Sequence, residues 1–480
     1  MNAPEASPNE ETPQIHLRQF LPIFAAVFLP MFLAAVDQTL LATATPVIAT
    51  ELGGLRDTSW VAVAYLLAAA AVVPLYGWLG DRLGLARILR YSLSLFALGS
   101  LACGLAQSLP QLVAARVLQG LGGGGLMTLC QALIGELVPP RQRGRFQGYF
   151  AAVFTLASVS GPVLGGLVVS QYSWRWLFLA NLPLAAIALW RLMVLPGVRS
   201  RDRIKGKVDG VGLIVFPILV ACVIFWISSV GHRFTWDAPA SAALVLVIVV
   251  GTRFLYRHEK RIPQPFLDLR LLAHPAIRAV MLSTLSFSSC MFALVFYLPI
   301  YLQLGLHSGA MKSGLLILPV TLGIVVGATL SGRALAMGVL PKWVPTTGLS
   351  ISATALGLLA WLGAEPTLIA VLGSLSGMGF GSVMPSTQVI AQTVGGRDRL
   401  GVATSLASLS RSLGAALGTT IFGVLIFTLL PGVPHNAAPA DFLLLPPLQV
   451  QHAFHIAFAL MACTAAAGAF AASRAPAVRL

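Results

Sequence analysis

Charged residues are scarce in this chain. Asp, Glu, Lys and Arg make up 10% of its 480 residues, whereas soluble domains carry about 25%. Hydrophobic residues make up 57%, and the mean hydropathy is +0.84. This composition excludes an ordinary soluble enzyme, a nucleic-acid-binding domain and a disordered chain. Acidic residues are fewer than basic ones, 16 against 31, and in a membrane protein that excess reflects Lys and Arg kept in cytoplasmic loops.

Cysteine is scarce as well. The five cysteines are odd in number, far apart and each inside an apolar run, so they predict no disulfide framework and no metal site. His452 and His455 lack a third ligand, and we interpret them as interfacial residues. The chain has no Walker glycine–lysine loop, so ATP is not the predicted energy source. We expect no cofactor, no metal and no enzymatic activity, since an enzyme in the membrane would need clustered acids, histidines or cysteines there.

Long apolar runs are what the sequence does contain, and they predict fourteen transmembrane helices. The runs cover about residues 20–49, 57–80, 86–106, 109–132, 145–169, 175–196, 209–230, 239–256, 277–303, 313–336, 343–363, 367–391, 401–429 and 453–473. They are too long for barrel strands of about 9–11 residues. The segment before the first run is polar and acidic, unlike a signal peptide, so we expect the first helix to be retained.

The basic residues set the predicted orientation. With the N-terminus in the cytoplasm, 25 of the 31 Lys and Arg residues fall on the cytoplasmic side. Four fall in outer loops (Arg56, Arg175, Arg233 and Lys312) and two within spans. This asymmetry predicts that both termini are cytoplasmic and that the protein is a multi-pass protein of the cell (inner or plasma) membrane. It also removes nucleic acid as a partner and makes the lipid bilayer one.

A weak internal repeat divides the chain. Five glycines recur 253 residues further on: Gly120, Gly124, Gly148, Gly161 and Gly165 as Gly373, Gly377, Gly401, Gly414 and Gly418. General glycine enrichment of membrane helices is the alternative explanation. The repeat predicts a cytoplasmic tail at 1–19, a six-helix half at 20–196, two inserted helices with basic loops at 197–276, a second six-helix half at 277–473 and a tail at 474–480. We expect the glycine-bearing helices to pack where the halves slide past each other.

Three ionisable residues lie within spans, where a charge is costly and indicates function. Asp37 is the only acid well inside a span, and a buried carboxyl group poised beside an arginine can carry protons. Arg116 cannot titrate usefully; it would tune Asp37, or it is a fixed polar contact between helices. Asp37 could likewise be structural, and for Arg411 a structural role is as good a prediction as a functional one. Asp209 opens its span and is explained as a helix N-cap.

The loop between the second and third spans reads GWLGDRLGLARIL. It resembles the signature loop of the major facilitator superfamily, which Gly77, Asp81, Arg82, Gly84 and Arg87 match. The resemblance implies a conformational gate, in which Asp81 sits at a helix N-terminus of the other half. Leu85 and Ala86 occupy two positions that are usually basic in this pattern. The loop therefore has fewer charged side chains than is typical.

Other motifs narrow the resemblance to one branch of that superfamily. The Arg116 segment RVLQG is similar to its proton-transfer motif, and GPVLGG, with Gly161, Pro162 and Gly165, is similar to its antiporter motif. With the strings LAAVDQTLLATATP, SWRWLFLANLP and LPIYLQLGL, the chain looks like a fourteen-helix drug:proton antiporter. The implied fold is an all-α membrane protein of two six-helix pseudo-repeat halves with two inserted helices.

The implied function is proton-coupled export of amphipathic toxic compounds, cationic or neutral, by alternating access. Small organic substrates and protons are the implied partners, and the 431–451 outer loop could contact a periplasmic adaptor. Aromatic residues are candidates for the substrate cavity, although each also fits lipid-facing or packing roles: Tyr65, Phe154, Phe292, Tyr297 and Tyr301. Two alternatives remain, a same-fold exporter of one metabolite, lipid or siderophore, and a ligand-gated regulator without transport.

Overall fold

A computed structural model of the chain is helical throughout its described part, with no strand there. The described residues are 17–52, 59–194, 209–229, 237–262, 265–266, 268–308, 310–362, 365–396, 398–430 and 446–478. The N-terminal tail up to residue 16 and most of the 431–451 loop lie outside them. The expectation of an all-α protein is confirmed.

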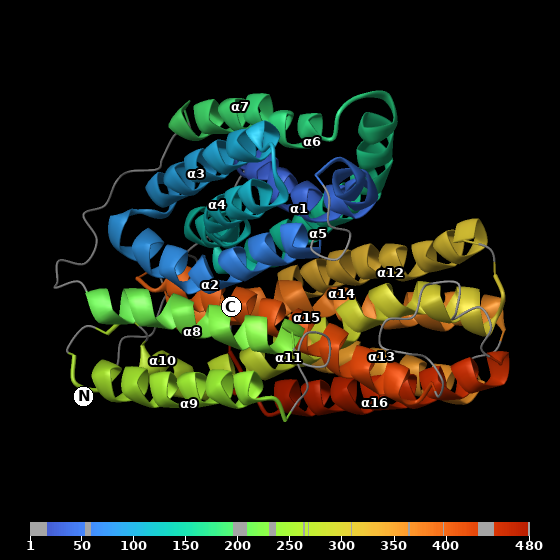
Figure 1. Cartoon of the computed structure of the whole chain (residues 1–480). Helices are drawn as coiled ribbons and strands as arrows, with labels where there is room; N and C mark the ends of the chain where they lie inside the picture. Colours follow the sequence, from blue (N-terminus) through green and yellow to red (C-terminus); the bar gives the residue numbers. More distant parts are fainter. Residues whose placement is uncertain are drawn as a thin grey trace, which may run out of the picture.

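The helices fall into three groups along the chain (Figure 1). The first group is α1 (Leu17–Leu52), α2 (Ser59–Leu83), α3 (Leu85–Leu105), α4 (Leu109–Leu137), α5 (Pro140–Gln171), α6 (Arg175–Leu179) and α7 (Asn181–Val194). The second is α8 (Gly210–Ser229), α9 (Pro239–Glu259) and α10 (Leu269–Ala273). The third is α11 (Pro275–Ile300), η1 (Tyr301–Gly305), α12 (Ala310–Ala336), α13 (Trp343–Leu362), α14 (Pro366–Gly395), α15 (Leu400–Thr428) and α16 (Pro447–Ser473).

Thirteen helical segments of the described residues are long and apolar enough to cross a bilayer. The 32-residue helix α5 is not among them. Several side chains of α5 lie outside the described residues. The count of fourteen spans and the cytoplasmic termini therefore stay predictions.

Two of the expected spans are built differently from a single α-helix. The sixth consists of α6 followed by α7, which begin at Arg175 and Asn181. The ninth ends in the π-helical turn η1, directly after Pro299. Proline lacks the N–H that an α-helix needs and clashes with the preceding turn, which favours such a local change of winding. The short helix α10 was not expected at all.

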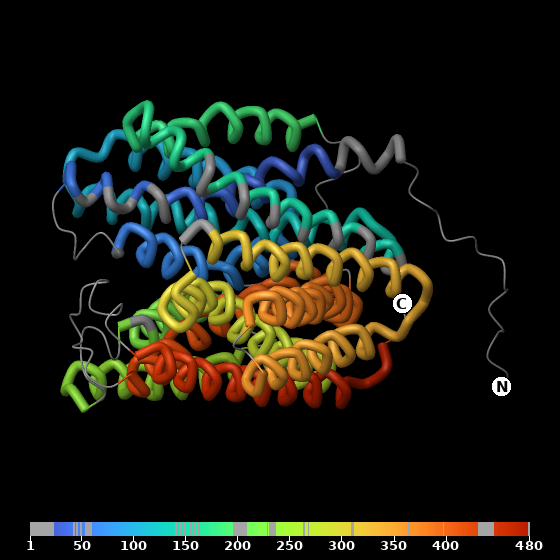
Figure 2. Tube along the Cα trace, turned by 90° about the vertical axis from the view of Figure 1, so that its right-hand side faces the viewer, coloured from blue at the N-terminus to red at the C-terminus, as the bar shows by residue number. Residues whose placement is uncertain are grey.

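Two hydrophobic cores organise the helices. One core is formed by residues of α1 to α5 and α7, and the other by residues of α11 to α16 with η1. In Figure 1 the first set forms the upper layer and the second the lower layer, and the turned view in Figure 2 separates them in the same way. Helix α8 packs between α2 and α15 through Ala70, Ala71, Val220, Ile224 and Leu409. The inserted pair α8–α9 thereby contacts both layers.

The repeated glycines mark equivalent helix contacts in the two layers. Gly120 brings α4 against α2, where an added Cβ would lie 3.0 Å from the Cβ of Ala68. Gly373 brings α14 against α12 in the same way, 2.9 Å from Val320. Gly161 and Gly414 likewise seat α5 on α1 and α15 on α11. Small residues allow such close backbone approach; these four glycines join helices within a layer, whereas Gly401 meets Gly77 of the other layer.

The layers meet through α2 with α15, α5 with α12, and α4 with α14 and α15. Gly77 of α2 and Gly401 of α15 form one close approach between them. A Cβ at Gly77 would lie 2.7 Å from the carbonyl carbon of Gly401 and 2.8 Å from the Cβ of Ser405. Neither helix can accept a larger residue here without moving away from the other.

We expect Gly77→Ala to lower the unfolding free energy by about 1–3 kcal/mol, the usual cost of overpacking a tight contact. The measurement is the thermal unfolding midpoint of the purified protein in detergent. Gly166→Ala on α5 is the matched control, because no atom lies within 4 Å of the Cβ it would add. An equal midpoint for the two variants would contradict the close approach of α2 and α15.

Candidate functional site

An ion pair lies buried between α1 and α4. Nη1 of Arg116 donates to Oδ2 of Asp37 at 2.7 Å, and the two residues are 1% and 3% exposed. A charge at membrane depth is costly unless it is paired and hydrogen-bonded. The pair meets that condition, and it brings together the two residues predicted to couple protons.

Neutral polar groups complete the surroundings of this pair. Gln119 accepts from Nη1 of Arg116 at 2.6 Å and donates to Oδ1 of Asp37 at 2.8 Å and to Ser100 at 2.9 Å. Asn181 of α7 also donates to Ser100, at 3.4 Å. The network therefore joins α1, α3, α4 and α7, and both oxygens of the carboxylate have a donor.

The Arg116 guanidinium is held on its other sides as well. Its Nε donates to the carbonyl of Val61 at 2.9 Å, and its Cζ lies 4.3 Å from the ring centroid of Tyr65 and 5.7 Å from that of Phe178. Aromatic faces attract cations, most strongly when both are desolvated. Tyr65, predicted to line a substrate cavity, is 1% exposed and packs on the ion pair.

A single carboxylate lies at the centre of this arrangement. Asp37 is the one carboxyl group of the network, and protonating it would remove the ion pair while leaving the amide and hydroxyl contacts. Among the described residues, no group of three His, Cys, Asp or Glu side chains gathers at a possible metal site.

A second polar contact joins the two layers at the end of α2. Asp81 is 3% exposed, and its carboxylate accepts from the backbone N–H of Gly401 at 2.6 Å and of Val402 at 2.9 Å. These N–H groups belong to the first turn of α15, which has no partner for them within its own helix. An aspartate here also interacts favourably with the positive end of the helix dipole. Asp81 thus caps a helix of the opposite layer.

The rest of the signature loop shapes the turn from α2 into α3. Gly84 has φ 97°, a left-handed conformation that only glycine adopts without strain. Arg82 lies over the ring of Trp78 at 4.2 Å, and Arg87 is exposed on α3. These residues keep the loop compact around Asp81.

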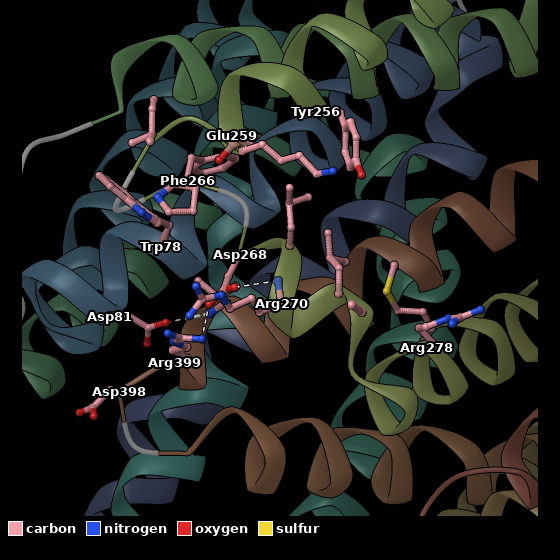
Figure 3. A pocket seen from close by; sticks show the side chains of 18 of the residues that line it. Trp78, Asp81, Tyr256, Glu259, Phe266, Asp268, Arg270, Arg278, Asp398 and Arg399 are labelled. Carbon is pink, nitrogen blue, oxygen red and sulfur yellow. Dashed lines mark hydrogen bonds and ion pairs between the residues drawn. The ribbon is translucent and has the colours of Figure 1, made fainter.

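A cavity of about 1090 Å³ opens beside Asp81. Figure 3 shows side chains from α2, from the segment between α9 and α11 and from the α14–α15 loop converging on it. Across the cavity Asp268, the N-cap of α10, forms an ion pair with Arg399, the residue before α15. The segment after the inserted helices is thereby tied to the same helix terminus that Asp81 caps.

The inserted helices are anchored near this cavity by Asp209. Its Oδ1 accepts from the backbone N–H of Gly212 at 2.9 Å, which is the expected N-cap of α8. It also pairs with Nε2 of His258 at 2.8 Å and accepts from the N–H of Phe266 at 3.3 Å. Asp209 therefore joins α8, the end of α9 and the segment after it.

An ion pair on the predicted outer side joins the end of α1 to α6. Arg175 donates to Glu51 at 2.5 Å, and the indole N–H of Trp174 donates to the same carboxylate at 2.7 Å. The hydrogen bond from Arg175 holds the pKa of Glu51 below its usual value. The contact is largely exposed, so it contributes little to stability.

The other predicted cavity residues lie apart from the ion pair. Tyr301 is fully buried against Phe454 and Phe458, while Tyr297 donates to the carbonyl of Thr419 at 2.6 Å. Phe292 packs on the same core of the α11–α16 layer. The side chains of Phe154 and Pro162 lie outside the described residues. Gly161 and Gly165 are buried on α5.

Sequence reasoning missed a group of buried glutamines between the layers. Nε2 of Gln388 donates to Oε1 of Gln131 at 2.9 Å, and Nε2 of Gln392 donates to the carbonyl of Gln131 at 3.0 Å and lies 3.4 Å from Thr404. Amides within apolar runs, four residues apart on α14, were the available signal. They show that α4, α14 and α15 meet in a polar contact.

Comparison with known proteins agrees with this architecture. The family model of the Major Facilitator Superfamily matches residues 27–419. The chain belongs to the major facilitator superfamily. Members of this superfamily are membrane transporters.

Several relatives within the superfamily are transporters of bacteria. An uncharacterised MFS-type transporter of Mycobacterium tuberculosis is 32% identical over 85% of this chain and 60% of its own length. The multidrug transporter MdtP of Bacillus subtilis is 29% identical over 84% of this chain and 75% of its own. A multidrug resistance protein B homologue of Mycobacterium tuberculosis is 31% identical over 82% and 74%. The chain thus spans less than two thirds of the length of the uncharacterised Mycobacterium tuberculosis transporter.

Solved superfamily structures share the fold. The human organic anion transporter TETRAN superposes with a TM-score of 0.67 over 96% of this chain and 100% of its own. The proton:xylose symporter XylE superposes with a TM-score of 0.64 over 94% and 95%. Each is 14% identical in sequence, so the likeness establishes the major facilitator fold alone.

We expect Asp81→Asn to lower the unfolding free energy by about 1 kcal/mol, the usual cost of a lost helix cap. The amide keeps one acceptor but loses the negative charge at the α15 terminus. The measurement is the thermal unfolding midpoint in detergent.

Asp268→Asn is the matched control for this measurement. It breaks an ion pair to Arg399, which is 52% exposed, and such pairs contribute about 0–1 kcal/mol. Asparagine still caps α10. A larger loss for Asp268→Asn than for Asp81→Asn would show that the exposed pair, not the buried cap, joins the layers.

Proposed function

We propose that this transporter is a drug:proton antiporter of the plasma membrane that exports amphipathic organic compounds, cationic or neutral overall. The observation that carries the proposal is the buried Asp37–Arg116 pair. It holds the only acid well inside a span, and the pair is embedded in hydrogen bonds that survive protonation. The multidrug names of two relatives support the same substrate range.

Asp37 is the proton carrier in this mechanism. When it is charged, Arg116 and Gln119 tie α1 to α4 through both carboxylate oxygens. Protonation neutralises the carboxyl group and weakens the contact to Arg116, whose other partners, Val61 and Gln119, keep the guanidinium in place. Loading and release of one proton would therefore change how firmly α1 is held against α4.

Alternating access requires that the two layers part on one side at a time. The contacts at Gly77, Asp81 and Gln131 join the layers near the ends of α2 and α4 that the charge distribution assigns to the cytoplasm. This supports a conformation closed toward the cytoplasm, with Asp81 as the contact that breaks when the transporter opens inward.

The two halves at 20–196 and 277–473, with the inserted segment 197–276 between them, are part of this proposal. So is an adaptor at the 431–451 loop. An exporter of one metabolite, lipid or siderophore remains the alternative, and competition among unrelated dyes would separate it from a multidrug pump.

We expect Asp37→Asn to abolish uncoupler-sensitive ethidium efflux, because asparagine cannot carry the proton. The measurement is ethidium fluorescence in energised inverted vesicles, with and without an uncoupler, at matched expression. Asp268→Asn, which alters an acid outside the spans, should keep the efflux. Undiminished uncoupler-sensitive efflux in Asp37→Asn would place the proton site elsewhere.

Exchange of one proton for one neutral molecule moves net charge, so a membrane potential should drive it by about 2.3 kcal/mol per 100 mV. Exchange of a proton for a monovalent cation moves none and should be indifferent to voltage. The measurement is uptake into proteoliposomes whose potential is set by a potassium gradient and valinomycin. A neutral substrate whose export ignores voltage would contradict a single-proton cycle.

A further inference from the structure

Arg411 carries a buried donor that has no partner. It lies on α15, ten residues beyond Gly401 in the sequence, and its Nε is buried without a hydrogen bond. The contact that the described residues offer it is the sulfur of Met127 on α4, 3.7 Å from Nη2. A thioether is a weak acceptor, so the guanidinium charge is uncompensated.

The contrast with Arg116 shows what a structural arginine looks like in this protein. Arg116 donates to a carboxylate, an amide and a backbone carbonyl, as buried polar groups generally do. Arg411 joins α15 to α4 through one weak hydrogen bond, to the sulfur of Met127. A fixed polar contact between helices does not explain Arg411, because its partly buried side chain keeps a buried Nε–H without an acceptor, which costs free energy.

The described acids of the spans are held away from Arg411 in this conformation. Asp37 is bound to Arg116, and Arg116 precedes Met127 by eleven residues on α4, or about 16 Å along the helix. Asp81 lies at the α15 terminus, about 15 Å from Arg411 by the same geometry. Among the described residues, therefore, no acid compensates the charge of Arg411.

Further unpartnered polar atoms lie on the same surfaces. Gln131 follows Met127 by one turn of α4, and Thr404 precedes Arg411 by seven residues, so it shares a face of α15. Nε2 of Gln131 and Oε1 of Gln392 are buried with no hydrogen bond in the described structure, as is Oε1 of Gln388. Arg411 thus lies beside a zone between the layers that offers both donors and acceptors to a guest.

We propose that Arg411 binds an anionic group, a carboxylate above all, of the transported compound between α4 and α15. Gln131, Gln388 and Gln392 form hydrogen bonds with hydroxyl or amide groups of the same compound. The inference rests on the proposed export function and adds, within its substrates, a preference for amphipathic compounds bearing a carboxylate. Zwitterions fall within the neutral range already proposed, and organic anions extend it.

The test compares two dyes that differ in one group, a rhodamine with a free carboxylate and its methyl ester. Their binding to the purified protein is measured by fluorescence anisotropy in detergent, without any proton gradient. We expect the acid to bind about tenfold or more tightly than the ester, since a hydrogen bond to a charged group contributes that much. In Arg411→Gln this preference should vanish, while Arg411→Lys should retain part of it.

Arg333→Gln is the control, because it removes an exposed arginine of α12 and should leave the preference unchanged. Equal binding of acid and ester by the parent protein, or an undiminished preference in Arg411→Gln, would overturn the proposal.

A second measurement needs no ligand. Without an anion, Arg411→Met removes an uncompensated charge and replaces it with a side chain suited to Met127, so the thermal unfolding midpoint should equal or exceed that of the parent. Arg116→Met, which strands Asp37, should unfold at a lower temperature. If Arg411→Met lowered the thermal unfolding midpoint as much as Arg116→Met does, Arg411 would be a structural residue and the proposal would be overturned.

These readouts are separate from proton coupling. Asp37→Asn should keep the dye preference even where it abolishes efflux. If Asp37→Asn left efflux intact, proton coupling through Asp37 would fail while the Arg411 preference would still stand. If Arg411→Gln kept the preference and Asp37→Asn lost efflux, the substrate inference alone would fail.

Discussion

The hydrogen-bonded ion pair of Asp37 and Arg116 is the constraint on which the N-terminal layer depends. At membrane depth there is no water to satisfy a charge, so each ionised group needs its partners within the protein. Here the partners come from α1, α2, α3, α4 and α7, and the position of one carboxylate thereby fixes how those helices pack. The same requirement makes the pair responsive, because a single proton changes the charge that the network was built to hold.

The contacts between the layers follow a different principle. Several are specific pairings of small or polar groups: a glycine against a glycine, an aspartate on the first turn of α15, and amides shared between α4 and α14. Such a contact can open and close, whereas the two hydrophobic cores within the layers remain intact.

Arg411 and Arg116 are both arginines within membrane-spanning helices, but their surroundings are opposite. Arg116 has its anion within the chain, which suits a fixed role beside a titrating acid. Arg411 has none among the described residues, which suits a site completed by a guest. The inserted helices contribute at another level, since α8 contacts both layers and the segment after α9 reaches the α15 terminus.

The sequence alone determined the helical membrane class, the superfamily and the identity of the residues that bear charge within the spans. These follow from composition, run length and local motifs, which tertiary contacts do not alter. It could not decide that Gln119, Ser100 and Asn181 surround Asp37, or that Tyr301 packs in a core, because neither polarity nor aromaticity reveals which helix face meets another. Only the tertiary structure brought Asp81 to the α15 terminus and left Arg411 without an anion, since both depend on distances between helices hundreds of residues apart.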